Sequence, residues 1–108
     1  MSLAVRMVNL YKYLTEEKRE YVLSKQILRS GTSVGAMVYE SEHSESTADF
    51  IHKLAIAQKE INETLYWLEL LSKTEYITPK EYDSIRTDAT EVIKLLTSIL
   101  KTIKKQQQ

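Results

Sequence analysis

Apolar residues recur every three or four positions along almost the whole chain, which is the spacing of one face of an α-helix. Four segments carry this pattern, and we expect helices at about residues 2–14, 17–43, 47–74 and 79–104. The breaks between them are short, and short connections favour antiparallel neighbours. The pattern predicts an all-α protein with one domain over residues 1–108: an antiparallel up-down-up-down four-helix bundle. The first helix is about half as long as the others, so the bundle should be incomplete at one end.

Polar residues at the breaks predict where the helices start. Thr15 and the two acids after it suit the start of the second helix, and Ser46 followed by Asp49 is close to a capping box. Thr78 followed by Pro79 is a strong signal for the start of the fourth helix.

The second and third helices each carry an additional apolar stripe. In the second helix it lies roughly 150° from the expected core stripe at ~100° per residue. A bundle helix in a monomer needs one apolar stripe. Two stripes predict two partners, and aromatic residues are enriched at interfaces. The alternative is that the aromatic residues complete the monomer's own core. The predicted oligomer interface contains Tyr21, Leu28, Thr32, Gly35, Tyr39, Tyr66 and Leu70.

The segment 30–36, SGTSVGA, is poor in helix formers, and each glycine costs about 1 kcal/mol relative to alanine. Gly31 and Gly35 are one helical turn apart, and their small size permits close approach of another backbone. A loop between two short helices is the alternative. The uninterrupted apolar period favours a continuous helix.

Composition narrows the class of protein. Of 108 residues, 43% are hydrophobic, with two glycines, one proline and no cysteine. The absence of cysteine excludes thiolate metal sites and fits a cytoplasmic location. Fifteen basic residues balance fifteen acidic ones, so bulk charge does not indicate a nucleic-acid clamp. We expect no membrane span, because no apolar run approaches ~20 residues.

Few residues suggest catalytic or metal chemistry. Glu40 and His43 form one Glu-x-x-His pair, whereas di-iron bundles need two such pairs and further glutamates. Asp49 and His52 are a weak second pair, and both pairs flank a predicted turn. We therefore expect no catalytic site, no metal and no cofactor, hence no enzyme.

Basic residues give the candidate nucleic-acid surface. Lys18, Lys25 and Arg29 fall on one face of the predicted second helix, where they could meet phosphates. A solvated face partly paired with glutamates is the more ordinary explanation. A second cluster, Lys101, Lys104 and Lys105, also favours the helix macrodipole, so a structural explanation suffices for it.

Two blocks of the sequence resemble a known family. They are residues 24–36, SKQILRSGTSVGA, with Glu40 beyond them, and residues 49–57, DFIHKLAIA, continuing through Glu60, Glu63-Thr64 and residues 66–71. The chain resembles the bacterial four helix bundle family of 23S ribosomal RNA intervening-sequence proteins. Met37 and Tyr39 depart from the family pattern.

The resemblance implies a ring, typically a homopentamer, and similarity to accessory proteins of diversity-generating retroelements, which bind nucleic acid and a reverse transcriptase. Carried over by position, the resemblance makes Lys25 and Arg29 the basic candidates for binding nucleic acid. It implies that Ser33 and Glu40 are structural residues. We expect a non-enzymatic oligomer that binds RNA, DNA or a reverse-transcriptase-like partner. The alternative is a protein-interaction adaptor that binds no nucleic acid.

Overall fold

Four helices make up the protein. The computed structural model describes residues 2–106, so both ends of the predicted domain 1–108 lie outside it. The helices are α1 (Ser2–Glu16), α2 (Leu23–Ser41), α3 (Thr47–Lys73) and α4 (Pro79–Gln106). The prediction of an all-α protein with four helices is confirmed. Three of the four predicted starts agree with the structure.

The predicted start of the second helix at residue 17 is wrong. α1 continues to Glu16, and α2 begins only at Leu23. Arg19 between them adopts the left-handed conformation, with φ of 52°. A left-handed residue cannot continue a right-handed helix, so the chain turns here. Thr15, predicted to begin α2, instead donates a hydrogen bond from its hydroxyl to the Tyr11 carbonyl within α1.

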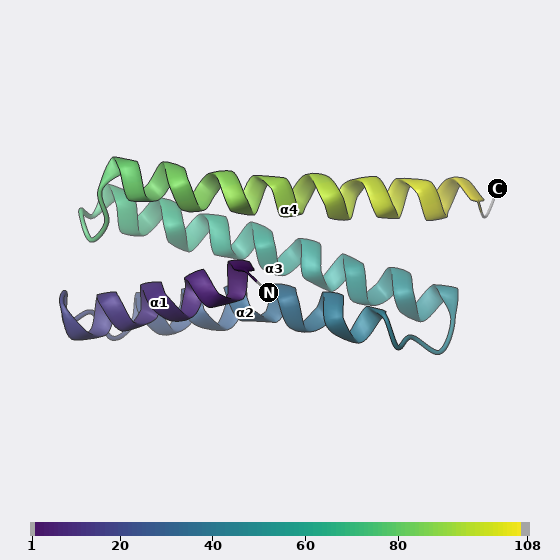
Figure 1. Cartoon of the computed structure of the whole chain (residues 1–108), viewed down its shortest axis with the longest axis horizontal. Helices are drawn as coiled ribbons and strands as arrows, with labels where there is room; N and C mark the ends of the chain where they lie inside the picture. Colours follow the sequence, from purple (N-terminus) through teal and green to yellow (C-terminus); the bar gives the residue numbers. More distant parts are fainter. Residues whose placement is uncertain (1, 107–108) are drawn as a thin grey trace.

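The helices pack unequally. α2 and α3 share the most extensive contact, α1 packs on α2, α4 packs on α3, and α1 touches α4 only slightly. Figure 1 shows that α1 runs beside one half of α2, while α3 and α4 extend the full length of the molecule. Between α1 and α4, the Arg6 guanidinium forms an ion pair with Asp88 at 2.7 Å and donates to the Ser84 hydroxyl at 3.0 Å.

The predicted apolar stripes form the core. All four apolar positions of the first stripe are buried: Leu3, Met7, Leu10 and Leu14. Ile27 and Val34 of α2 meet Leu54, Ile61 and Leu68 of α3 in the same cluster. Of the helix starts predicted from capping signals, those at Ser46 and Thr78 are also observed. Across residues 2–106, no helix has an apolar stretch long enough to cross a membrane.

Side chains cap the third and fourth helices. The Ser46 hydroxyl accepts from the Asp49 N–H at 3.1 Å. Thr78 and Glu81 form a reciprocal capping box: the Thr78 N–H donates to the Glu81 carboxylate at 2.8 Å, and the Glu81 N–H donates to the Thr78 hydroxyl at 3.1 Å. Each cap satisfies N–H groups that have no partner inside the helix.

The small-residue segment is helical throughout, so the alternative of a loop at residues 30–36 is wrong. Gly31 is buried where α1 crosses α2, and a Cβ atom there would overlap the Cγ and Sδ atoms of Met7. Gly35 differs, because its nearest neighbour would be the Ala4 Cβ at an ordinary 3.8 Å. Gly31 is therefore required by the contact between α1 and α2 of one chain, and Gly35 is not.

This difference gives a matched pair of substitutions. Gly31→Ala should destabilise the protein by about 1–2 kcal/mol, because overpacking against the fully buried Met7 outweighs the gain in helix propensity. Gly35→Ala in the same helix should stabilise it, by up to about 1 kcal/mol. Urea unfolding followed by circular dichroism measures both. Effects of the same sign would contradict the close approach of Met7 to Gly31.

Candidate functional site

The three predicted basic residues do not share one helix face. Lys18 lies in the connection before α2, where its Nζ atom sits 5.8 Å from the centre of the Tyr13 ring. The prediction that placed Lys18 on the second helix with the other two is therefore wrong. Lys25 is exposed in the first turn of α2. Arg29 lies one turn further along the helix.

Arg29 is held by carboxylates of α3. Its guanidinium forms ion pairs with Glu60 and Glu63, and the Glu63 carboxylate also accepts from the Trp67 indole N–H at 3.1 Å. Slightly more than half of the Arg29 side chain is exposed, so each ion pair is weakened by solvent. The charge available for a phosphate is nevertheless largely neutralised. Arg29 acts first as a link between α2 and α3.

A buried hydrogen bond lies beside this link. The Thr64 hydroxyl donates to the Ser30 hydroxyl at 2.9 Å, between two side chains that are fully buried. Each hydroxyl also lies within hydrogen-bond distance of a carbonyl of its own helix, Ile27 for Ser30 and Glu60 for Thr64, so both buried polar groups are satisfied where α2 meets α3. Ser33, expected to be structural, donates from its hydroxyl to the Arg29 carbonyl.

The structure exposes a different row of cations. Lys94, Lys101 and Lys105 are exposed on α4 with spacings of seven and four, which place them on one face of the helix. These lysines form no ion pair with any residue in 2–106. Sequence reasoning had explained Lys101 and Lys105 by the helix macrodipole and had left Lys94 out. The spacings of seven and four residues between these lysines could have identified this row from the sequence.

The predicted interface residues are partly exposed. Tyr21, Tyr39 and Tyr66 are 55%, 64% and 60% exposed, so none of these rings completes the core of the chain. Leu28, Thr32, Gly35 and Leu70 are half-buried. Tyr66 packs edge-on against Trp67, with ring centres 5.0 Å apart. Large apolar side chains also face solvent at Val22 and Leu95.

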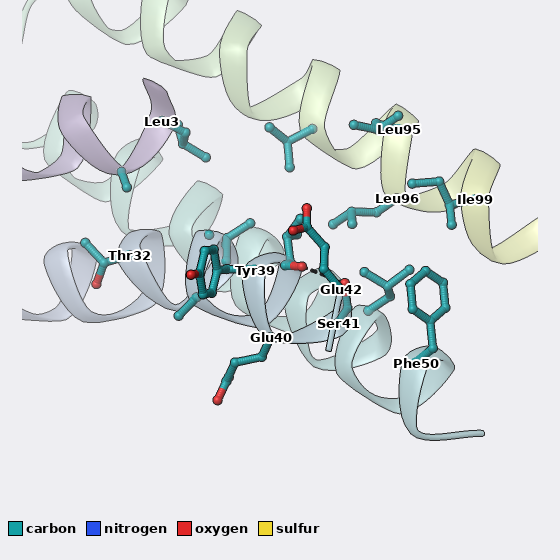
Figure 2. A pocket seen from close by; sticks show the side chains of 17 residues that line it. Leu3, Thr32, Tyr39, Glu40, Ser41, Glu42, Phe50, Leu95, Leu96 and Ile99 are labelled. Atoms are coloured by element: carbon teal, nitrogen blue, oxygen red, sulfur yellow. Dashed lines mark hydrogen bonds between the residues drawn. The ribbon is translucent and has the colours of Figure 1, made fainter. Parts of the chain in front are cut away.

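A groove opens beyond the N-terminal turn of α1. It has a volume of about 790 Å³ and lies among the N-terminal turn of α1, the second half of α2, the start of α3 and the second half of α4. Figure 2 shows Leu3 at one end, Phe50 and Ile99 at the other, and Leu95 on the α4 wall. Its lining is mostly apolar, and its charged residues are Glu40 and Glu42.

One member of each weak metal-ligand pair makes other contacts. Asp49 accepts from Lys53 Nζ at 2.9 Å and from the Glu45 N–H, and the hydrogen bond from Lys53 lowers the pKa of Asp49. The His43 ring packs edge-on against Tyr39, with ring centres 5.8 Å apart. Across residues 2–106, no three His, Asp or Glu side chains gather as a set of metal ligands.

Glu20 organises the connection that carries Lys18 and Tyr21. Its carboxylate accepts from the backbone N–H groups of Val22, Leu23 and Ser24 at 2.7–3.1 Å, and so caps α2. Partial burial raises the pKa of Glu20, but the three backbone donors together outweigh burial, and the pKa is lowered overall. The charged form is therefore the one that stabilises the fold.

Comparisons with known proteins agree on a family. The profile of the 23S rRNA-intervening sequence protein family matches residues 1–98. A crystal structure of a protein with unknown function from the S23 ribosomal protein family of Bacteroides thetaiotaomicron is 63% identical, covers 93% of each chain and superimposes with a TM-score of 0.92. No curated protein matches the chain.

The Glu20 cap predicts a pH dependence of stability. Because its pKa is lowered in the folded state, its charge stabilises the protein above the ordinary glutamate pKa of about 4.3, and this contribution is lost as the pH falls through the lowered value. Glu20→Gln should therefore reduce stability at pH 7 by about 1 kcal/mol and have a much smaller effect near pH 3. Thermal unfolding of both proteins across this range measures the difference. A difference independent of pH would contradict a charged cap.

Proposed function

The chain belongs to the 23S rRNA-intervening sequence protein family, and we propose that it is a non-enzymatic, self-associating helical bundle of the cytoplasm that binds RNA or a nucleoprotein partner. The observation that carries the proposal is the apolar and aromatic surface that one folded chain leaves in solvent. Binding through such a surface requires no catalytic group.

We infer that the bundle is antiparallel, up-down-up-down. The connections at residues 17–22, 42–46 and 74–78 are short, which favours neighbours of opposite direction. The colours in Figure 1 support this course, because α2 and α4 progress toward the end of the molecule that α1 does not reach and α3 progresses away from it.

Exposure on the α2–α3 side of the bundle supports self-association. Tyr21 and Tyr66 are more than half exposed, and Leu28 and Leu70 are only half-buried. Aromatic side chains of this kind gain most when an interface removes them from water. A closed ring of five chains, as the family resemblance implies, would cover one such surface on every subunit.

RNA binding would use cations repeated around the assembly. The positive charge would come from four exposed lysines: Lys25 on α2, and Lys94, Lys101 and Lys105 on α4. Arg29 is less suitable, because it already faces two carboxylates. The net charge of one chain is zero, so a modest local patch must be multiplied by repetition to hold a polyanion. DNA or a reverse-transcriptase-like protein with bound nucleic acid would meet the same cations.

The groove favours a second candidate function. A protein-interaction adaptor would use an apolar cleft to receive a segment of another protein, without contacting nucleic acid. The groove beyond α1 is such a cleft, and its charged residues are acidic, so it is unsuited to phosphate.

Light scattering tests the assembly. The native protein should have several times the 12.6 kDa mass of one chain, with five as the expected multiple. Tyr66→Asp should lower the mass, because it places a charge in the proposed interface. Val5→Asp, at a position on α1 that is 51% exposed, is the matched control and should leave the mass unchanged. A native mass of one chain would exclude this proposal.

A salt series tests RNA binding. Affinity for single-stranded RNA should fall steeply as salt rises. The double variant Lys101→Gln, Lys105→Gln should bind more weakly and reduce the slope of log affinity against log salt by about 1–2, if both residues contact phosphate. Arg29→Gln should change the slope less, since its carboxylate partners already neutralise it. Absence of binding at about 50 mM salt would exclude RNA and favour the adaptor.

A further inference from the structure

We infer that the groove beyond α1 receives an amphipathic helix of a partner protein, about three turns long, with its N-terminal end against Glu42. The inference rests on the adaptor function and makes it specific. It does not require RNA binding, and it assigns Thr32, Gly35 and Tyr39, which line the groove, to the partner helix and not to the interface between subunits.

The shape of the groove is that of a missing helix segment. α1 packs along the first half of α2, and Leu3 and Ala4 in its first turn lie at one end of the groove. Past that point α1 is absent, and α2 and α4 continue alongside α3, as Figure 1 shows. The lining spans residues 32–42 of the α2 side, about 16 Å at 1.5 Å per residue. A helix of about three turns fits that length.

The walls of the groove present apolar surface that the chain does not bury. Leu95 on α4 is 59% exposed, and Val38 and Val92 are only half-buried. Leu96 and Leu54 behind them are buried and complete the floor. The small side chains of Gly35 and Ala36 leave room on the α2 wall. Such a surface matches the apolar face of an amphipathic helix, with contacts one turn apart.

The two ends of the groove have opposite polarity. At one end the C-terminus of α2 and the N-terminus of α3 lie together, so their dipoles oppose each other, and the negative charge comes from Glu42, which points into the groove in Figure 2. At the other end lies the N-terminus of α1, with the positive end of its dipole. Neither Glu40 nor Glu42 forms an ion pair with a residue in 2–106.

This polarity sets the direction and charge of the partner. A helix that begins beside Glu42 and ends beside Leu3 places its positive end on the carboxylate and its negative end on the start of α1. Lysine or arginine in its first turn adds to the attraction, because the groove lining holds two acids and no base. The partner helix therefore runs in the same direction as α1.

Two designed peptides of identical composition test the inference. Each is a twelve-residue helix, stapled on its polar face, with leucines at positions i, i+3, i+4 and i+7; one carries its lysines in the first turn and the other in the last. Fluorescence anisotropy with the full chain measures binding. The peptide with lysines in the first turn should bind about tenfold more tightly, and Glu42→Gln should remove most of that difference.

Matched variants locate the binding surface. Leu95→Asn, at a position exposed enough to tolerate the change, should weaken the preferred peptide about tenfold or more. Val22→Asn, at a position 70% exposed and outside the groove, should leave the affinity within about twofold. Equal effects of the two variants, or no preference between the peptides, would overturn the inference.

The same samples separate this inference from the proposed assembly. If Leu95→Asn lowers the mass measured by light scattering, a second copy of the chain covers the groove and the partner helix is excluded. If the mass is that of a single chain while peptide binding follows the expected pattern, the assembly fails and the helix-binding groove stands.

Discussion

The packing of α2 against α3 is the contact on which the rest of the structure depends. α1 rests on α2 and α4 rests on α3, while α1 and α4 barely touch each other and are joined mainly through Arg6. Each outer helix is therefore positioned by its own inner partner. The buried hydrogen bond between Ser30 and Thr64 lies inside the apolar cluster that holds the inner pair together. The exposed tyrosines, the lysine row and the groove all take their positions from this pair.

The block of sequence that carries the family resemblance is explained largely by internal contacts. Arg29 reaches two carboxylates of α3, Ser30 bonds to Thr64, and Gly31 admits Met7 of α1. These residues join three helices of one chain within three consecutive positions. They identify the fold strongly and say little about a ligand.

Much of the fold was predictable because burial in a bundle follows the helical period. Local capping chemistry also placed the starts of α3 and α4, where Ser46 and Thr78 cap the helices. The start of α2 was missed because Arg19 adopts a left-handed conformation that no glycine or asparagine announces, and because a glutamate in the turn supplies the cap. Pairing of the basic residues with glutamates was considered, but the partners of Arg29 could not be named, because Glu60 and Glu63 lie more than thirty positions along the chain, beyond the reach of any periodic pattern.

The unequal lengths of the helices also divide the molecule into parts of different rigidity. Where α1 is present, four helices enclose Met7, Leu14 and Ile27, which are fully shielded from solvent. Where it is absent, three helices must hold their shape with fewer neighbours, and regions with sparse burial open at lower free energy than the global unfolding transition. Local fluctuations should therefore concentrate at the last turns of α2 and α4. A surface that closes on a ligand would be slow to form on the rigid half, and the groove beyond the N-terminal turn of α1 lies in the half where we expect the backbone to adapt more readily.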